Sequence, residues 1–343
     1  MIMMPAKTYV DLKSEVWEVG KCSGCGGCVA VCPADAITFP EQGDNATPVQ
    51  SGYCKQETDG VPCGACYAVC PRVAGQTTDT LGTYLDIVSA KSRADIPRRQ
   101  SGGAVTAILM NALNTGMIDA VVTVTEDRFT LRPASVVITS AEQLVHEAGS
   151  RYSWWVPLLA ALKTAVITRK YKKIAIVGVP CVVQAISRIR SSDHDLLVPY
   201  ARAIRLVIGL FCTETFDYTA LVEKKLKAGH NIATWEIKKL DVRGKLIITM
   251  KDGNVFSFPM KELDDTVRTG CHICTDATSL FSDVSAGSVG SPEGYTTLII
   301  RNSVGKAFVD SAVSAGILEV TGDIDKDAIE KLAASKIKKN ATG

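Results

Sequence analysis

Twelve cysteines are the residues of this chain whose type and spacing could do chemistry, and eight of them lie between Cys22 and Cys70. The first four have the spacing C-x2-C-x2-C-x3-C, followed by proline. The next four begin at Cys54 and, after a loop of eight residues, end on C-x2-C-x3-C, again followed by proline. Closely spaced thiolates on a glycine-rich turn can wrap an iron–sulfur cubane, because glycines let backbone amides approach its sulfurs. The spacing therefore predicts two [4Fe–4S] clusters.

In two-cluster ferredoxins, the last cysteine of each such run binds the neighbouring cluster. We therefore predict that one cluster is held by Cys22, Cys25, Cys28 and Cys70. The other is predicted to be held by Cys54, Cys63, Cys66 and Cys32. Zinc is the alternative for these thiolates, but structural zinc prefers paired C-x2-C units separated by a longer loop. The doubled C-x3-C-P ending favours the iron–sulfur interpretation.

The remaining four cysteines are dispersed in the sequence: Cys181, Cys212, Cys271 and Cys274. The first two follow apolar, strand-like runs at turns that contain glycine or proline, where loops converge at one end of a sheet. Four thiolates that meet there could hold a third cubane. Two other interpretations stay open on spacing alone: isolated cysteines that pack as small hydrophobes, and a C-x2-C pair that binds zinc or is redox-active.

The elements that must position these residues alternate between strand and helix from about residue 81 onward, which predicts an α/β fold. Strands are expected at 86–90, 120–124, 173–178 and 206–210, and helices at 102–113, 154–168, 182–190 and 218–227. A more β-rich stretch covers 234–258. We divide the chain into an N-terminal two-cluster module (1–80), a core (81–322) and a C-terminal helix (323–343).

The C-terminal helix, at 325–339, is expected to turn Ile329, Leu332 and Ile337 inward. Its last turn carries three lysines, Lys336, Lys338 and Lys339. Lysines favour a helix C-terminus, so we interpret the three as a solvated end and not as a binding patch.

The bulk composition limits the possible partners. The 343 residues carry 38 basic and 36 acidic side chains, a formal charge of +2, so nucleic acid or an anionic membrane is not the expected main partner. No stretch reaches the roughly 18 apolar residues of a membrane span, and no secretory signal is expected at residues 1–7. We therefore expect a cytoplasmic protein with reduced thiols and no direct membrane span.

Two glycine-containing segments could cradle a phosphate. Neither a dinucleotide-binding G-x-G-x-x-G after a strand nor a P-loop is present, so NAD chemistry is disfavoured. The first candidate is the predicted helix start SGGAVT at 101–106, after Arg98 and Arg99, and the second is GSVGSPEG at 287–294. Backbone amides at a helix N-terminus bind a pyrophosphate. An ordinary helix cap and a flexible turn, respectively, are the alternatives.

Five short motifs, in this order, resemble those of the family of coenzyme F420 hydrogenase/dehydrogenase β subunits: SGGAVT at 101–106, GVPC at 178–181, GLFC at 209–212, CHICTD at 271–276 and DVSAGSVG at 283–290. The resemblance implies a flavoprotein core that binds FAD and a [4Fe–4S] cluster and exchanges a hydride with coenzyme F420, a 5-deazaflavin. It implies three clusters in all, with Cys181, Cys212, Cys271 and Cys274 as ligands of the third. The candidate FAD and F420 contacts are Ser101, Gly102, Gly103, Ala104, Thr106, Ser150, Arg151, Tyr152, Pro180, Asp283, Gly287, Gly290 and Ser291.

Within this family, the N-terminal module is similar to that of the F420-oxidising subunit of the reduced-F420 dehydrogenase complex. This similarity implies partner subunits of a membrane-bound, complex-I-like proton pump, with methanophenazine or menaquinone as the final acceptor and the chain held on the cytoplasmic face. A β subunit that serves formate dehydrogenase or hydrogenase, or a soluble ferredoxin:F420 oxidoreductase, remains an alternative. So does a non-enzymatic ferredoxin-type carrier.

Individual roles are expected for a few residues of the core. Arg98, Arg99 and Arg151 are hypothesised to attract coenzyme F420, which carries a phosphate and a glutamate tail. Asp276 and Asp283 stand out by the resemblance, and a structural role in holding the cluster loop is an equal alternative to a catalytic one. No catalytic residue is assigned, because hydride transfer requires no general acid or base.

Overall fold

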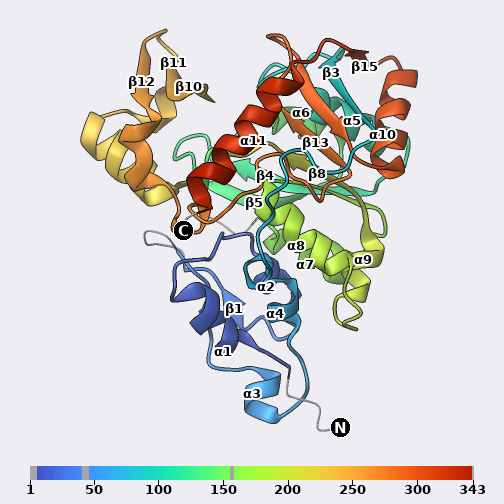
Figure 1. The fold of residues 1–343 in the computed structure, drawn as a ribbon, viewed down its shortest axis with the longest axis vertical. Helices are drawn as coiled ribbons and strands as arrows, with labels where there is room; N and C mark the ends of the chain where they lie inside the picture. The colour runs from blue at the N-terminus through green and yellow to red at the C-terminus, as the bar shows by residue number, and fades with distance from the viewer. Residues whose placement is uncertain (1–5, 41–45, 155–157, 342–343) are drawn as a thin grey trace.

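The computed structural model describes residues 6–40, 46–154 and 158–341, and Figure 1 shows an N-terminal module at one end of a larger body. The helical elements of the module are α1 (Tyr9–Leu12), η1 (Lys13–Trp17), α2 (Gly27–Val31), α3 (Lys55–Asp59), α4 (Ala65–Val69) and η2 (Pro71–Val73). Strands β1 (Ile37–Thr38) and β2 (Val49–Gln50) pair antiparallel between them. Helices α2 and α4 repeat one design, because each follows a glycine in the left-handed region, Gly26 or Gly64, and ends at a cysteine that precedes proline.

An eight-stranded mixed sheet forms the centre of the larger body, in the order β15-β3-β14-β13-β8-β7-β4-β5. Its strands are β3 (Asp86–Ser92), β4 (Ala120–Glu126), β5 (Pro133–Ile138), β7 (Ile174–Gly178), β8 (Ile204–Leu210), β13 (Val284–Gly287), β14 (Thr296–Ile300) and β15 (Leu318–Thr321). The four neighbours β13, β8, β7 and β4 run parallel. Parallel strands end at the same edge of a sheet, so the loops that follow these four converge.

Both faces of the sheet are covered, which explains why its central strands are apolar throughout. Along β7, Ile174 and Ile176 contribute to one hydrophobic core, and Ala175 and Val177 to the other. The first core contains α7 (Ala160–Lys163), its continuation η3 (Thr164–Thr168), α8 (Pro180–Arg190) and α9 (Val198–Ala203). The second contains α5 (Ala104–Asn114), α6 (Ala141–His146) and α10 (Ser303–Ser314).

A smaller antiparallel sheet stands beside the large one (Figure 1) and consists of β10 (Ile237–Val242), β11 (Lys245–Met250) and β12 (Val255–Pro259). It packs with η4 (Thr219–Gly229) and η6 (Met260–Thr266) in a core of its own. The short elements β6 (Ser153–Trp154), β9 (Phe216–Asp217), η5 (Thr234–Glu236) and η7 (Thr269–Cys271) lie in the connections, and α11 (Lys326–Asn340) ends the chain.

The structure confirms the α/β class with an N-terminal ferredoxin-like module, and the predicted strands and helices are present with shifted ends. Two differences concern the element bounds. The strand predicted from residue 234 begins at Ile237, after a short 3-10 turn. The helix predicted for 154–168 is helical over 160–168, and its residues 155–157 lie outside the described part. The elements that the sequence did not predict include β5, β13, β14, α10 and β15.

The module shares a hydrophobic core with the larger body, since Ala30, Val31 and Val69 belong to the same buried cluster as α7, α8 and α9. Hydrogen bonds cross the same interface. Tyr200 donates its hydroxyl to the carbonyl of Ala30 (2.7 Å), and Arg188 donates to the carbonyl of Ala68 (2.7 Å). The two parts therefore stabilise one another, and the division at residue 80 stays a prediction.

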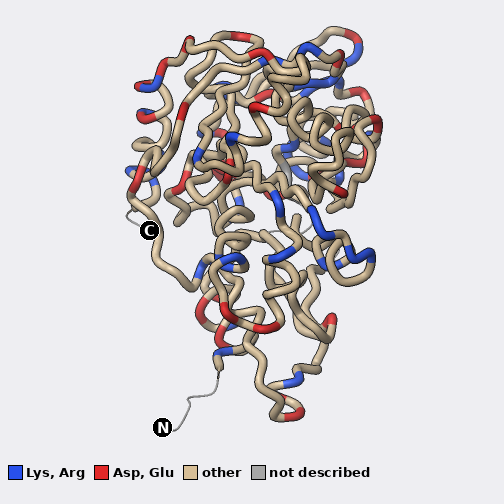
Figure 2. The backbone as a smooth tube through the Cα atoms, turned by 90° about the vertical axis from the view of Figure 1, so that its right-hand side faces the viewer, with Lys and Arg blue, Asp and Glu red and all other residues tan. Residues whose placement is uncertain are grey.

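Basic and acidic residues are interspersed along the chain (Figure 2), as expected from the formal charge of +2. Among the described residues, no helix combines the length and the apolar character that crossing a bilayer requires.

We expect Gly270→Ala to destabilise the interface between the module and the core. A methyl group at this position would lie 2.2 Å from the carbonyl oxygen of Cys22 and 2.9 Å from that of Lys21, and both are backbone atoms that cannot turn away. Overpacking of this kind costs about 1–3 kcal/mol. The thermal unfolding midpoint of the anaerobic protein should fall for Gly270→Ala. It should stay unchanged for the control Gly75→Ala, whose added methyl meets nothing within 4 Å. Equal midpoints would show that the interface tolerates the extra atom.

Candidate iron–sulfur and cofactor site

The first group of module cysteines, which we call the inner group, surrounds a hollow of about 310 Å³, with the open space at its mouth included. Its members are Cys22, Cys25, Cys28 and Cys70. The backbone N–H groups of Gly24 and Gly27 donate to the first two thiols, as the glycine-rich turn predicts. Burial raises the pKa of the Cys25 thiol to about 12, and the neighbouring thiol of Cys70 adds to this rise.

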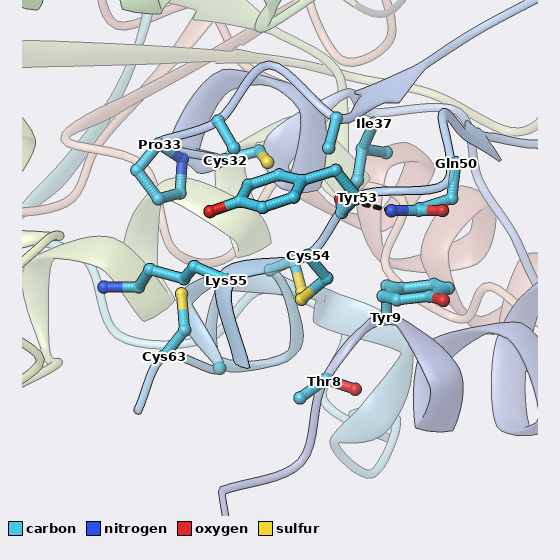
Figure 3. A pocket seen from close by; sticks show the side chains of 14 residues that line it. Thr8, Tyr9, Cys32, Pro33, Ile37, Gln50, Tyr53, Cys54, Lys55 and Cys63 are labelled. Atoms are coloured by element: carbon cyan, nitrogen blue, oxygen red, sulfur yellow. Dashed lines mark hydrogen bonds between the residues drawn. The ribbon is translucent and has the colours of Figure 1, made fainter. Parts of the chain in front are cut away.

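The second group, the outer group, surrounds a hollow of about 400 Å³. Its members are Cys32, Cys54, Cys63 and Cys66. Figure 3 shows the first three on different sides of this hollow, together with the rings of Tyr9 and Tyr53. The structure therefore brings together the two sets of four cysteines that the crossover rule predicts, with Cys32 and Cys70 exchanged between the runs.

The larger body holds two of these outer cysteines through their backbones. Lys163 in α7 donates to the carbonyl of Cys32 (2.6 Å), and the ring of His194 lies 3.0 Å from the carbonyl of Cys63.

A third group, the core group, forms at the edge of the large sheet. Cys181 lies in the first turn of α8 directly after β7, and Cys212 comes two residues after the neighbouring strand β8 ends. Cys271 and Cys274 reach the same place from the loop that follows η6. The four interact electrostatically, because desolvation raises the pKa of the partly buried Cys212 to a value well above that of a free thiol, and the thiols of Cys271, Cys274 and Cys181 add to this rise. The convergence expected from the strand-end turns is therefore present.

Arg72 lies between the inner group and the core group. Its side chain is buried, and its guanidinium donates to the carbonyl of Gly270 (3.1 Å), while the buried Nε has no hydrogen-bond partner among the described residues. Burial would lower the pKa of Arg72, but Cys274 and Cys181 outweigh this and raise it. The same guanidinium acts on Cys22 in the inner group.

The three groups form one row. Cys25 of the inner group acts on the thiol of Cys181, and Cys66 of the outer group acts on that of Cys28. The order from the sheet edge outward is therefore core, inner, outer.

The lysines at the C-terminus of α11 do not share one environment, which corrects the expectation of a solvated end. Lys338 and Lys339 are exposed, but Lys336 is 5% exposed and donates to the carbonyls of Cys212 (2.7 Å) and Asp276 (2.7 Å). Together with Arg72, Lys336 lowers the pKa of Cys274 although burial of the thiol opposes this. Both cations were missed as site residues.

The predicted phosphate segment 101–106 also lies at this edge of the sheet. Gly103, with φ 73°, caps α5, whose first N–H groups have no acceptor within the helix. Gly102 has a different role, since an added Cβ would lie 2.3 Å from the carbonyl of Ala90 and 2.8 Å from the amide of Thr296. Gly102 therefore allows the chain to pass close to β3 and β14, while the helix start remains available to an anion. Ser101, Ala104 and Thr106 lie on either side of this cap.

In the second predicted phosphate segment, 287–294, close packing explains the glycines at 287 and 290. A Cβ on Gly287 would lie 2.1 Å from the ring of Phe211, and one on Gly290 would lie 2.6 Å from Ile329 in α11. Ser291 shares hydrogen bonds with the hydroxyls of Ser89 (2.7 Å) and Thr297 (2.6 Å). These contacts fix the loop against α11 and β14.

Asp283 is separated from the other candidate cofactor residues. It directly precedes β13 and so lies at the amino edge of the sheet, whereas Gly287 is the last residue of β13 and lies at the carboxyl edge. Its carboxylate accepts two hydrogen bonds from Arg190 (both 3.1 Å), one from the amide of Val207 (2.7 Å) and one from Asn302 (2.9 Å). These partners account for Asp283 structurally.

Asp276 is buried and accepts from the amide of Leu280. Burial raises the pKa of its carboxyl.

Three arginines meet beside the start of α5. Burial lowers the pKa of Arg98, and the charges of Arg128 and Arg151 lower it further, so the three guanidinium groups lie close together. Arg151 is engaged by Glu126 (3.7 Å) and Glu147 (3.5 Å). Sequence reasoning missed Arg128, which no motif distinguishes.

The loop that carries Ser150, Arg151 and Tyr152 continues from these arginines toward the smaller sheet. Gln100 donates to the hydroxyl of Tyr152 (3.3 Å) and to Asp241 in β10 (2.9 Å). Arg99, the third arginine expected to attract the substrate, lies close to Gly103 through its aliphatic stem. Pro180 is buried at the first turn of α8.

The chemistry of these residues fits iron–sulfur clusters, because each group offers four cysteine thiols, the ligands such clusters take. The buried cations Arg72 and Lys336 form no ion pair with a carboxylate within 4.0 Å among the described residues, so an anionic centre at the core group would compensate them. Over the described ranges, no three His, Cys, Asp or Glu side chains converge on one metal ion, and the thiols of a cubane need not do so, because each binds a different iron. The start of α5 and the arginines beside it suit the phosphate groups of FAD or coenzyme F420.

Three protein-family models match this chain. A 4Fe-4S dicluster domain covers residues 21–74. The N-terminal and C-terminal parts of the coenzyme F420 hydrogenase/dehydrogenase β subunit cover residues 87–163 and 171–326.

Similar proteins agree with the family models. An uncharacterised protein of Methanocaldococcus jannaschii is 43% identical over 97% of this chain and 98% of its own length. A subunit of the F(420)H(2) dehydrogenase of Methanosarcina mazei is 34% identical over 87% of this chain and 84% of its own. A chain of the F420-reducing [NiFe] hydrogenase complex from Methanosarcina barkeri superposes with a TM-score of 0.71 at 30% identity, and the match covers 78% of this chain and 94% of that one.

The resemblance carried by the five short motifs is thereby confirmed. This chain, which has a 4Fe-4S dicluster domain before its core, belongs to the family of coenzyme F420 hydrogenase/dehydrogenase β subunits, which are F420-dependent oxidoreductases.

Proposed function

We propose that this chain oxidises reduced coenzyme F420 at the carboxyl edge of its large sheet and delivers the electrons through three [4Fe–4S] clusters to a partner protein. The observation that carries the proposal is the row of three four-cysteine groups, which begins at the sheet edge and ends in the module. The ligands proposed for the third cluster are Cys181, Cys212, Cys271 and Cys274. The module clusters take the inner and outer groups.

FAD held at this edge of the sheet would accept the hydride, pass its two electrons on singly to iron–sulfur centres and release its proton to solvent. The residues of this chain provide binding and orientation for that exchange. The N–H groups at the start of α5 and the guanidinium groups of Arg98 and Arg128 attract the phosphates and carboxylates of the two ligands. The Ser150–Tyr152 loop and β10, joined by Gln100, close the site from the side of the smaller sheet.

The module supports an acceptor outside this chain. The module carries the inner and the outer group, and two further clusters there would extend the path away from the substrate. We propose that the acceptor is another subunit of a membrane-bound, complex-I-like dehydrogenase, with methanophenazine or menaquinone as the final acceptor and the chain on the cytoplasmic face. The 34% identity to a subunit of the F(420)H(2) dehydrogenase supports this assignment.

Other acceptors would use the same site. A β subunit of an F420-reducing hydrogenase or formate dehydrogenase, or a soluble ferredoxin:F420 oxidoreductase, would keep the cofactors and differ only in the protein that contacts the module.

The cofactor content of the anaerobically purified chain tests the proposal directly. We expect about twelve irons, since three cubanes of four irons fill the three groups, together with equal acid-labile sulfide and one FAD per polypeptide. Added reduced coenzyme F420 should be oxidised when an artificial one-electron dye is present, as its absorbance will show. About eight irons without flavin and without this reaction would instead identify a ferredoxin-type carrier.

Removing the positive charge beside α5 should weaken substrate binding. We expect the double variant Arg98→Gln and Arg128→Gln to raise KM for reduced coenzyme F420 at least about tenfold, because a hydrogen bond to a charged group contributes about 1.5–3 kcal/mol. The dependence of KM on ionic strength should also become weaker. Steady-state kinetics at several salt concentrations measure both.

The matched control is Arg205→Gln, an exposed arginine at the start of β8 and therefore at the opposite edge of the sheet. Its KM and salt dependence should equal those of the unmodified chain. A double variant that behaved like this control would show that the substrate binds elsewhere.

A further inference from the structure

The last helix, α11, presents one buried stripe to the rest of the molecule. Ile329, Ala333, Lys336 and Asn340 follow one another at i, i+4, i+7 and i+11, and all four are at most 6% exposed. The first two are apolar, and the last two are polar side chains that would be costly to bury without partners. Their partners are therefore the informative contacts of this helix.

Both polar side chains are hydrogen-bonded to the loops of the core group. Asn340 donates to the carbonyls of Cys271 (3.0 Å) and Cys274 (2.7 Å). Lys336 donates to the carbonyls of Cys212 (2.7 Å) and Asp276 (2.7 Å). One helix thus contacts the backbone at three of the four core cysteines.

The charge of Lys336 has no carboxylate partner within 4.0 Å among the described residues, and burial of an uncompensated ammonium is strongly unfavourable. Its Nζ donates instead to the carbonyl of Cys212 (2.7 Å), a proposed ligand of the third centre, so the positive charge lies beside the core group.

We propose that Lys336 is a positioning residue that raises the reduction potential of the third [4Fe–4S] centre. This inference rests on the proposed function, which assigns a cluster to the core group. Reduction adds one electron to the centre without a proton, so its negative charge grows by one. A fixed buried cation stabilises the more negative form, and charge and hydrogen bonding around a cluster set its potential.

A redox titration of the holoprotein with dithionite as the reductant, followed by electron paramagnetic resonance, tests this inference. In Lys336→Met, the reduction equilibrium of one centre should become about tenfold less favourable, which is about 59 mV for one electron. The other two centres should keep their potentials. Lys336→Arg retains the charge and should restore the potential of the unmodified protein.

The control is Lys338→Met, an exposed lysine on the same helix, which should leave all three potentials unchanged. Unaltered potentials in a Lys336→Met protein that retains all three centres would overturn the inference. If Lys336→Met loses four irons, Lys336→Gln, which keeps a donor without the charge, provides the same measurement, and an unshifted potential there has the same meaning.

Iron content of the unmodified chain separates this inference from the proposed function. About eight irons per polypeptide would remove the third centre, and with it the assignment of the core group as cluster ligands. About twelve irons, with the same potentials in Lys336→Met as in the unmodified protein, would leave the proposed function intact and would refute only the role of Lys336.

Discussion

The burial of Arg72 is the constraint on which the rest of the structure depends. A guanidinium in the interior needs negative charge or acceptors around it, and Arg72 finds them on two sides. On one side lie the thiols of Cys22 and Cys70 in the module, and on the other lie those of Cys274 and Cys181 in the core. The hydrogen bond from Arg72 to the carbonyl of Gly270 fixes the chain at this interface. The module cannot move away from the core without exposing this buried guanidinium and breaking its hydrogen bond to Gly270.

The sequence predicts those parts of the site whose residues lie close together along the chain, and it misses those that depend on contacts between distant segments. Three ligands of each module group lie close together in the sequence, and the crossover rule supplies the fourth, so the spacing predicts both groups, including the exchange of Cys32 and Cys70. Cys181 and Cys212 were predictable because each follows an apolar strand at a turn. Strands β13 and β14 were missed, because β13 has only four residues, and its pairing with β8 joins segments that are far apart in the sequence.

Lys336 shows why a pattern can be present and still be misinterpreted. Position 336 lies seven residues after Ile329, on the same face of the helix, so helical periodicity alone places it inward. The charge of the side chain argued for solvent, because lysine is rarely buried without a partner. Its partners are the carbonyls of Cys212 and Asp276, which only the tertiary fold brings to α11. The glycines at 287 and 290 are a second example. Close packing against Phe211 and Ile329 is enough to explain why glycine is needed there, without a bound ligand.

The order of strands in the large sheet explains how a site for a two-electron substrate can be joined to a path for single electrons. Strands β4 and β7 are parallel neighbours, so Glu126 at the end of one and Cys181 after the end of the other meet at the same edge. The arginines around Glu126 therefore lie at the same edge of the sheet as the core group. The module docks on α7, α8 and α9, which cover one face of the sheet. A substrate bound at the arginines needs no access to the module, and a partner protein at the outer group needs no access to the substrate, so each end of the path can change without altering the other.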